Sequence, residues 1–372
     1  MSLETGPQQE QPPRTGPTTR AAPGAPAEPF YRRREQARRW GALLLLIGIV
    51  WLVFELTVRS SVYGVRINLA ERSDTLPPRS FAASAVRING VNDDIELVPA
   101  VGEDITVEAT RRAGGWNKDV ATAALQGLEV VTEVQGDTLV ISVGGGNGLT
   151  RVLGRASAVS LRVAVPASTR VEATVVNGDI AVTGVQGDLM LQTVSGDVHA
   201  ERVSGDLRVN STSGDVRVRN HRGPLTVNTT SGTISAEGLI TGARLSTLSG
   251  DIELRGVNDG PAARAIAGAA DPQGDGDIII DTTSGNIVFE GRLASNAAGV
   301  ITTISGDVRV RLSDPADLRL DARTVSGELS SDLPLADDAP ERRRLSALIG
   351  PGTANLTITT TSGDVEIGAA RR

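Results

Sequence analysis

The chain has no cysteine and very few aromatic residues. Its 372 residues include four Phe, three Trp and two Tyr. The lack of cysteine excludes disulfides, zinc–thiolate sites and cysteine nucleophiles. Two histidines, His199 and His221, are too few for a multi-histidine metal site. No nucleic-acid partner is expected, because stacking platforms need aromatic faces and the net charge of −7 opposes phosphate binding.

The aromatic residues that are present gather at the amino-terminal end. Six of the nine lie within the first 63 residues. Large rings normally supply much of the buried area of a core. The rest of this chain must therefore build its core from Val, Ile, Leu, Ala and Thr.

The amino-terminal residues divide into a polar tail, an apolar run and a linker. Residues 1–39 are rich in Pro and Arg and lack apolar periodicity, which predicts a disordered cytoplasmic tail. Residues 40–58, WGALLLLIGIVWLVFELTV, would span roughly 28 Å as a helix, close to the hydrocarbon thickness of a bilayer. A transmembrane helix is therefore predicted there, followed by a linker over 59–80. A cleaved signal peptide is disfavoured, because 39 residues precede the run and no small-x-small site follows it.

The arginines around the apolar run predict an orientation. Five of them stand just before it, in YRRREQARR, and fewer follow it closely. The positive-inside rule then predicts a single-pass protein of the cell membrane, with its N-terminus inside and its C-terminal domain extracytoplasmic.

Glycine recurs every nine residues from position 178 to 232 and less regularly afterwards. Apolar residues recur two and four places after each glycine, with polar residues between them, which is the alternation of a strand with one buried face. Each glycine is expected in a turn that introduces a strand. These turn glycines are Gly178, Gly187, Gly196, Gly205, Gly214, Gly223, Gly232, Gly250, Gly285, Gly306, Gly327 and Gly363.

A second pattern has twice this period. Eight segments have the form T-x-S-G-x-Φ, where Φ is apolar and Ser once replaces Thr, as in TVSGDV (193–198) and STSGDV (211–216). The half-units between them lack the Thr. An 18-residue coil of two short strands and two turns predicts an all-β fold, a parallel β-solenoid (β-helix). An antiparallel meander would not keep the odd and even turns chemically distinct. Residues 18 apart would stack about 4.8 Å from each other, so the Thr and Ser residues would form hydroxyl ladders.

The regular solenoid is expected over residues 176–372, with insertions near 255–275 and 331–352. Residues 81–175 are β-rich but irregular, and we expect them to start and cap the stack. A short helix is expected around Lys118–Gln126.

Aspartate follows many of the turn glycines. Ser before Gly and Asp after it suit a tight turn, because both side chains bond nearby backbone groups. Calcium β-rolls also have a nine-residue period, but they need G-G-x-G-x-D. We interpret the aspartates as structural turn residues and expect neither a metal site nor a cofactor. They are Asp197, Asp215, Asp251, Asp307 and Asp364.

No catalytic constellation emerges from the sequence. A polysaccharide-cleaving β-helix enzyme could use an acidic pair such as Asp93–Asp94 or Asp337–Asp338, but neither pair has a basic or His partner nearby. There is no G-x-S-x-G nucleophile motif, and we expect the protein not to be an enzyme. Flat Thr arrays occur on ice-binding solenoids, but here the Thr residues stand beside charged turn residues.

The tandem SGDV and SGDI units, GVNDDIEL (90–97) and LTITTTSGDVEI (356–367) together resemble the putative-adhesin β-strand-repeat family. The resemblance covers roughly residues 81–370. It implies a prokaryotic envelope domain of unknown function with a β-solenoid fold, usually membrane-associated. The family has no accepted catalytic residues, so none is carried over.

Three functions follow from these observations. The first is a non-enzymatic, membrane-anchored envelope protein that displays its solenoid for adhesion or for interaction with an envelope protein or a glycan partner. The second is an envelope-stress sensor or signalling modulator that acts through the cytoplasmic tail. The third, and weakest, is a polysaccharide-active β-helix enzyme.

Overall fold

The chain divides into two compact units, Met1–Ile67 and Asn68–Arg372. The computed structural model describes residues 70–115, 117–144, 157–257, 276–314, 316–333 and 343–370. Every described residue belongs to the second unit.

Within these ranges the chain forms strands and a single helix, α2 (Lys118–Gln126). The amino-terminal strands are β1 (Ala70–Thr75), β2 (Arg79–Phe81), β3 (Ala85–Asn89), β4 (Asp93–Pro99), β5 (Ile105–Gly115), β6 (Glu129–Gln135), β7 (Thr138–Gly144) and β8 (Ser157–Val165). The middle strands are β9 (Arg170–Asn177), β10 (Ile180–Thr183), β11 (Leu189–Ser195), β12 (Val198–Glu201), β13 (Leu207–Ser213), β14 (Val216–Ser231), β15 (Ile234–Ser249) and β16 (Ile252–Val257). The last strands are β17 (Ile278–Ser284), β18 (Ile287–Gly291), β19 (Ala298–Ser305), β20 (Val308–Leu312), β21 (Leu318–Ser326), β22 (Leu329–Ser331), β23 (Arg344–Ile349), β24 (Ala354–Ser362) and β25 (Val365–Ala369).

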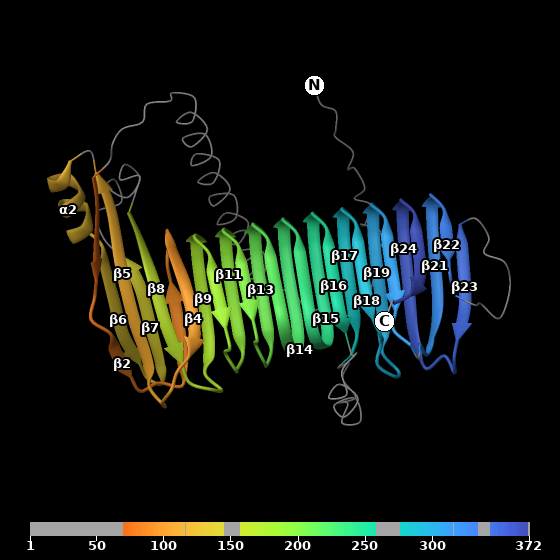
Figure 1. Ribbon diagram of the computed structural model, residues 1–372, viewed down its shortest axis with the longest axis horizontal. Helices are drawn as coiled ribbons and strands as arrows, with labels where there is room; N and C mark the ends of the chain where they lie inside the picture. Colours follow the sequence, from red (N-terminus) through yellow and green to blue (C-terminus); the bar gives the residue numbers. More distant parts are fainter. Residues whose placement is uncertain are drawn as a thin grey trace, which may run out of the picture. The chain divides into compact units, whose positions relative to one another are not determined.

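Each coil contributes one strand to each of two parallel ladders. The first ladder runs β7–β3–β9–β11–β13–β14–β15–β17–β19–β24–β21. The second runs β8–β4–β10–β12–β14–β15–β16–β18–β20–β25–β22. The long strands β14 and β15 continue through a turn and so belong to both ladders. Figure 1 shows the coils as a row of aligned strands along this unit, which is the predicted β-solenoid.

The 18-residue period sets the register of the stack. Leu189 pairs with Leu207, which pairs with Leu225 in the next coil. Equivalent apolar side chains therefore lie above one another and form continuous columns. The predicted coil length is confirmed.

The core consists of small aliphatic side chains. Strand β20 shows the pattern, with Val308, Val310 and Leu312 buried and Arg309 exposed. Among the described residues the buried apolar side chains are Val, Ile, Leu and Ala, apart from Phe289. The narrow coil leaves little room for rings, which explains why so few occur in this unit.

The stack departs from sequence order at its carboxyl-terminal end. Strand β24 pairs in parallel with β19 on one side and with β21 on the other, and β25 likewise lies between β20 and β22. The last coil of the sequence is therefore an interior coil of the fold. Strand β23 pairs antiparallel with β21 beyond it.

The amino-terminal end has the same kind of exchange. Strands β3 and β4, the first coil of the chain, lie between the β7–β8 coil and the β9–β10 coil. Antiparallel strands follow, with β6 on β7 and β5 on β8, and β1 and β2 pair with β5. Antiparallel strands thus cover both ladders at the amino-terminal end and the first ladder at the carboxyl-terminal end, a device that blunts open sheet edges.

The predicted short helix is confirmed, with the bounds Lys118–Gln126. Asn117 caps its N-terminus, because the Asn117 side-chain oxygen accepts a hydrogen bond from the Val120 amide at 2.8 Å.

The prediction of a transmembrane helix has to be corrected. Across the described ranges the one helix, α2, has nine residues, and no helix there is both long and apolar enough to cross a bilayer. Residues 40–58, on which the prediction rested, lie outside the described residues, as do the predicted tail over 1–39 and the first half of the linker. The described residues form a β-solenoid, and the correction extends to the predicted single-pass location in the cell membrane, which rested on that helix.

The two predicted insertions differ from each other. Most of the first, residues 258–275, lies outside the described residues. The second contains the ordered strand β23, whose Ala347 pairs with Leu320 of β21. Apolar residues at alternate positions of β23, such as Leu345, are buried at the β21–β22 end of the stack.

Candidate functional site

The turn glycines stand where successive coils come closest. All twelve predicted turn glycines have φ between 115° and 159°, a region that L side chains rarely adopt. At Gly214 a Cβ atom would lie 2.1 Å from the carbonyl oxygen of Gly196 in the adjacent coil. Glycine is required there for its backbone angle and also for close stacking.

The aspartates after these glycines bond to the neighbouring coil. Oδ1 of Asp179 accepts a hydrogen bond from the Asp197 amide at 2.8 Å, and Oδ1 of Asp197 accepts one from the Asp215 amide at the same distance. The ladder follows the exchanged order of coils, since Asp307 accepts from the Asp364 amide and Asp364 from the Glu328 amide. Asp251 accepts from the amide of Asn286. These carboxylates therefore satisfy backbone donors between coils.

The threonines of the repeat point into the solenoid. The seven that remain Thr in the motif are at most 8% exposed. Thr324 Oγ1 donates to the Gly363 carbonyl at 3.1 Å, and Thr303 Oγ1 lies 3.5 Å from the Gly285 carbonyl. The Thr ladder is an internal feature and offers no surface to ice.

The acidic pair Asp93–Asp94 has structural partners. Asp93 is 3% exposed and accepts hydrogen bonds from the amides of Val91 and Val159. Asp94 Oδ1 accepts from the Asp179 amide and so begins the aspartate ladder. The other pair, Asp337–Asp338, lies outside the described residues.

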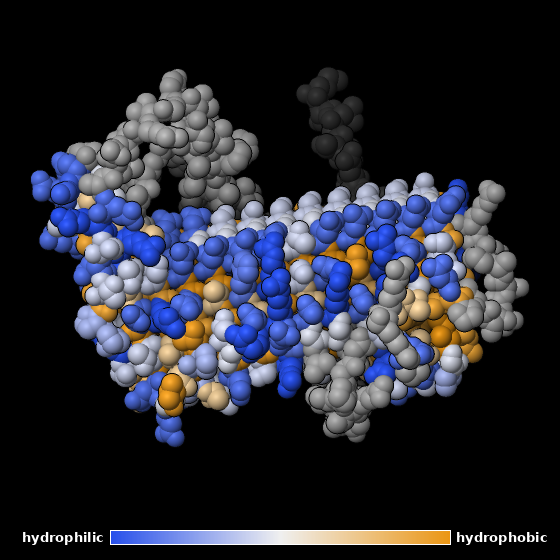
Figure 2. Space-filling model, viewed as in Figure 1, coloured by the Kyte–Doolittle hydropathy of each residue, from blue (hydrophilic) through white to orange (hydrophobic). Residues whose placement is uncertain are grey.

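Beside the turn glycines the solenoid presents a long strip without charge, which we call the uncharged edge. It comprises the x and Ser positions of the eight T-x-S-G motifs, which face outward at the ends of the first-ladder strands. Figure 2 shows pale, evenly spaced residues along the upper edge of this unit, where those strands end. The edge consists of Val194, Thr212, Thr230, Leu248, Thr283, Ile304, Thr361 and Val325, with Ser195, Ser213, Ser231, Ser249, Ser284, Ser305, Ser362 and Ser326.

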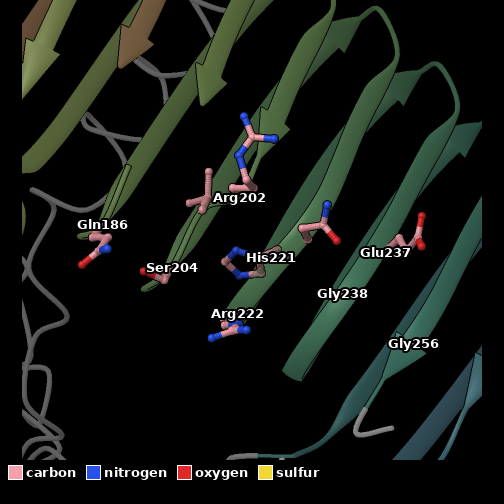
Figure 3. A pocket seen from close by; sticks show the side chains of 10 residues that line it. Gln186, Arg202, Ser204, His221, Arg222, Glu237, Gly238 and Gly256 are labelled. Atoms are coloured by element: carbon pink, nitrogen blue, oxygen red, sulfur yellow. The ribbon is translucent and has the colours of Figure 1, made fainter. Parts of the chain in front are cut away.

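A cleft of about 740 Å³ lies at the other turn of the middle coils. One row along it is formed by Gln186, Ser204 and Arg222. Their backbones form β-bridges across three coils, from Gln186 to Ser204 and from Ser204 to Arg222. Figure 3 shows His221 between this row and a second row that includes Arg202 and Glu237. The cleft thus combines two guanidinium groups with amide, hydroxyl and carboxylate side chains.

His221 lies beneath this cleft and is fully buried. Its Nε2–H donates to the Pro224 carbonyl at 3.1 Å, and its Nδ1 has no hydrogen-bond partner among the described residues. Burial lowers the pKa of the His221 imidazole below its usual value of 6.5, and nearby carbonyls and Asp206 oppose this less strongly. The ring is therefore neutral at pH 7.

The chain matches the sequence pattern of the Toastrack family (DUF4097) over residues 84–368. This match covers more than half of the chain. The chain belongs to the Toastrack family. The family expected from the SGD repeats is thereby confirmed.

Three solved structures are similar to this Toastrack chain. A putative adhesin from Bacteroides fragilis is 12% identical with a TM-score of 0.34, over 81% of this chain and 97% of its own. A putative cell adhesion protein from Clostridium sporogenes is 7% identical with a TM-score of 0.20, over 82% and 100%. A putative lipid binding protein from Parabacteroides distasonis is 10% identical with a TM-score of 0.30, over 82% and 98%. No curated protein matches the chain in sequence.

Sequence reasoning placed the two histidines of this Toastrack chain only in part. His199 faces outward on β12, as the strand alternation predicts. The sequence places His221 beside Gly223 in a turn of the repeat, but in the structure its side chain is buried at an inward position next to Val203 of the preceding coil. The signal was available, because RNHRGPL (219–225) departs from ERVSGDL (201–207) at five of seven positions. The same departure from the repeat would have singled out Arg222, which the sequence analysis did not name.

Replacing His221 with Val is expected to stabilise the Toastrack fold and to weaken its pH dependence. An unsatisfied buried polar atom costs about 1–3 kcal/mol, so part of this should be recovered. Because the folded pKa is lowered, below pH 6.5 the unfolded chain binds a proton at His221 that the folded chain does not. Stability is therefore lost as pH falls below 6.5 in the wild type, and the variant lacks this loss.

The measurement is urea unfolding of both proteins at pH 7.5 and at pH 5. The gap between their free energies of unfolding should widen at pH 5. Parallel behaviour at the two pH values would show that His221 is not the buried neutral group described.

Proposed function

We propose that the chain is a non-enzymatic binding protein that adheres through its uncharged edge to an extended neutral glycan. The observation that carries the proposal is the edge itself, where sixteen outward side chains carry no charge in a sequence that is 22% Asp, Glu, Lys and Arg. A surface that merely remains in water has no need to exclude charge over so many coils.

The edge offers the same groups at every step. One row is entirely serine, whose hydroxyl both donates and accepts hydrogen bonds. The row beside it alternates irregularly between Thr and aliphatic residues, and Leu248, Ile304 and Val325 are more than half exposed. Hydroxyls suit sugar hydroxyls, and aliphatic side chains suit the C–H faces of sugar rings.

The repetition favours an extended ligand. Successive coils lie about 4.8 Å apart, so a polymer laid along the edge meets a new pair of side chains at each coil. Individually weak contacts on one rigid scaffold then add through high effective concentration. A short soluble ligand would gain little from such a surface.

The test is co-sedimentation of the full chain with insoluble neutral polysaccharides, namely cellulose, chitin and a β-1,3-glucan. The double variant T212K/T230K puts two charges on the edge in adjacent coils. The matched control is His199→Lys, an exposed position on the second ladder. The proposal expects the wild type and the control to sediment with at least one polysaccharide, and the double variant to stay in solution.

Two outcomes would overturn the proposal. One is that the wild type sediments with none of the three polysaccharides. The other is that T212K/T230K sediments as well as the wild type, which would place binding elsewhere. Thermal unfolding of all three proteins checks that the changes leave the fold intact.

A further inference from the structure

The cleft between the middle coils differs in chemistry from the rest of the stack. Leu189, Leu207 and Leu225 align the three coils that form it. In this register Arg222 occupies the position of Ser204 and Gln186. Pro224 occupies the position that is aspartate in both preceding coils. One coil therefore gains a positive charge and loses a negative one at the same place.

The backbone around the cleft is also unusual. Arg202 has φ of 54° and Asn220 has φ of 53°, whereas Gly184 and Gly256 occupy the equivalent turn in the flanking coils with φ of 71° and 76°. A left-handed backbone angle costs a residue with a side chain about 1–2 kcal/mol. Two of the four turns that border the cleft thus carry a side chain where the other two have glycine, and at Arg202 this has a cost in stability.

A buried polar atom faces the same place. His221 follows Val185 and Val203 in its column and is followed by Gly238, and its Nδ1 is unsatisfied among the described residues. A valine at this position would fill the column without that cost. The unsatisfied Nδ1 is therefore not explained by packing, and the imidazole lies between the two rows of the cleft (Figure 3).

The two arginines are not equivalent. Arg202 is paired with the carboxylate of Glu201. None of the ion pairs found within the described ranges involves Arg222, which is exposed on the cleft row. The guanidinium of Arg222 is thus free to form the bidentate contact that a carboxylate favours.

We propose that this cleft binds a carboxylate-bearing sugar, with Arg222 on the carboxylate. Gln186 and Ser204, in the same row, supply donors and acceptors for hydroxyl groups, and Glu237 accepts from a hydroxyl across the cleft. Glu237 disfavours a phosphate, which carries more negative charge than a carboxylate. The volume of about 740 Å³ lies in the range typical of small-molecule sites. This site is separate from the uncharged edge and does not depend on it.

The test is calorimetric titration of the full chain with D-glucuronate, with D-glucose and inorganic phosphate as comparison ligands. The variant is Arg222→Gln, and the matched control is Arg219→Gln, an exposed arginine of the same coil that does not line the cleft. Wild type and R219Q should bind glucuronate equally. Loss of a charged hydrogen-bond partner should weaken binding by R222Q at least about tenfold.

The two histidines provide a second readout. Glucuronate should shift the imidazole ¹H NMR signals of His221, which lies under the cleft, and leave those of the exposed His199 unchanged. Absence of glucuronate binding, equal affinity for glucose or phosphate, or equal loss of affinity in R219Q would each overturn the proposal. A shift at His199 without one at His221 would do the same, because the ligand would then bind outside the cleft. If the chain failed to sediment with polysaccharides but bound glucuronate, the proposal for the cleft would stand, because the two experiments test different surfaces.

Discussion

Removing residues 354–372 is expected to abolish the cooperative folding of the whole carboxyl-terminal half of the solenoid. In a solenoid whose coils follow sequence order, such a truncation removes only the outermost coil. Here it removes β24 and β25, which lie between the β19–β20 and β21–β22 coils. The cut therefore opens a gap inside the stack.

The size of the effect follows from what the missing coil buries. Leu356, Ile358, Val365 and Ile367 are each at most 1% exposed. At about 1.5–3 kcal/mol for each fully buried aliphatic side chain, their loss costs roughly 6–12 kcal/mol. This is comparable with the entire stability of a typical domain, about 5–15 kcal/mol. Ladder hydrogen bonds are lost on both sides of the gap as well.

Thermal unfolding followed by circular dichroism, together with limited proteolysis, measures the effect. The control lacks only Arg371 and Arg372 and should match the full chain. Ile358→Ala should fall between the two, with a loss of about 2–5 kcal/mol. If the truncated chain kept the melting temperature of the control, the β21–β22 coil would have closed the gap by docking directly on β19–β20.

The exchange of coils marks the limit of what the sequence could predict about the fold. Coil length and inward positions could be predicted, because they depend on local spacing and alternation, as Leu189, Leu207 and Leu225 show. The order of the coils could not, because every coil carries nearly the same T-x-S-G-x-Φ motif. Any two such coils can pair, and Gly306 therefore neighbours Gly363 in the fold although Gly327 follows it in sequence.

The candidate sites could be predicted only where they repeat. The hydroxyl ladders were expected from spacing, but the ladder formed by the first Thr of each motif points inward, whereas the Ser ladder faces solvent. Arg222 and His221 lie in a single coil and have no counterpart in the others, so no periodicity distinguishes them from ordinary sequence variation. Their significance depends on neighbours in the adjacent coils, such as Ser204, and on burial.

Gly214→Val is expected to lower the free energy of unfolding by about 2–6 kcal/mol, from two additive causes. The backbone at Gly214 has φ of 131°, and holding a residue with a side chain in such a region costs about 1–3 kcal/mol. The new Cβ would also lie 2.1 Å from the Gly196 carbonyl oxygen, so the coils must separate, which costs about 1–3 kcal/mol more. No flexible side chain is available to move away, because the obstacle is backbone.

Two control substitutions separate these causes. Gly136 has φ of 64° but nothing within 4 Å of a built Cβ, so Gly136→Ala should show only the backbone cost, about 1–2 kcal/mol. Arg217 is a half-buried neighbour whose ion pair with Asp215 spans 2.7 Å, and its replacement by Ser should lower the free energy of unfolding by at most about 1 kcal/mol. Urea unfolding should rank the losses Gly214→Val, Gly136→Ala, Arg217→Ser. A Gly214→Val loss no larger than that of Gly136→Ala would mean that the coils are spaced loosely enough to admit a side chain, and that close contact between stacked turns does not hold this solenoid together.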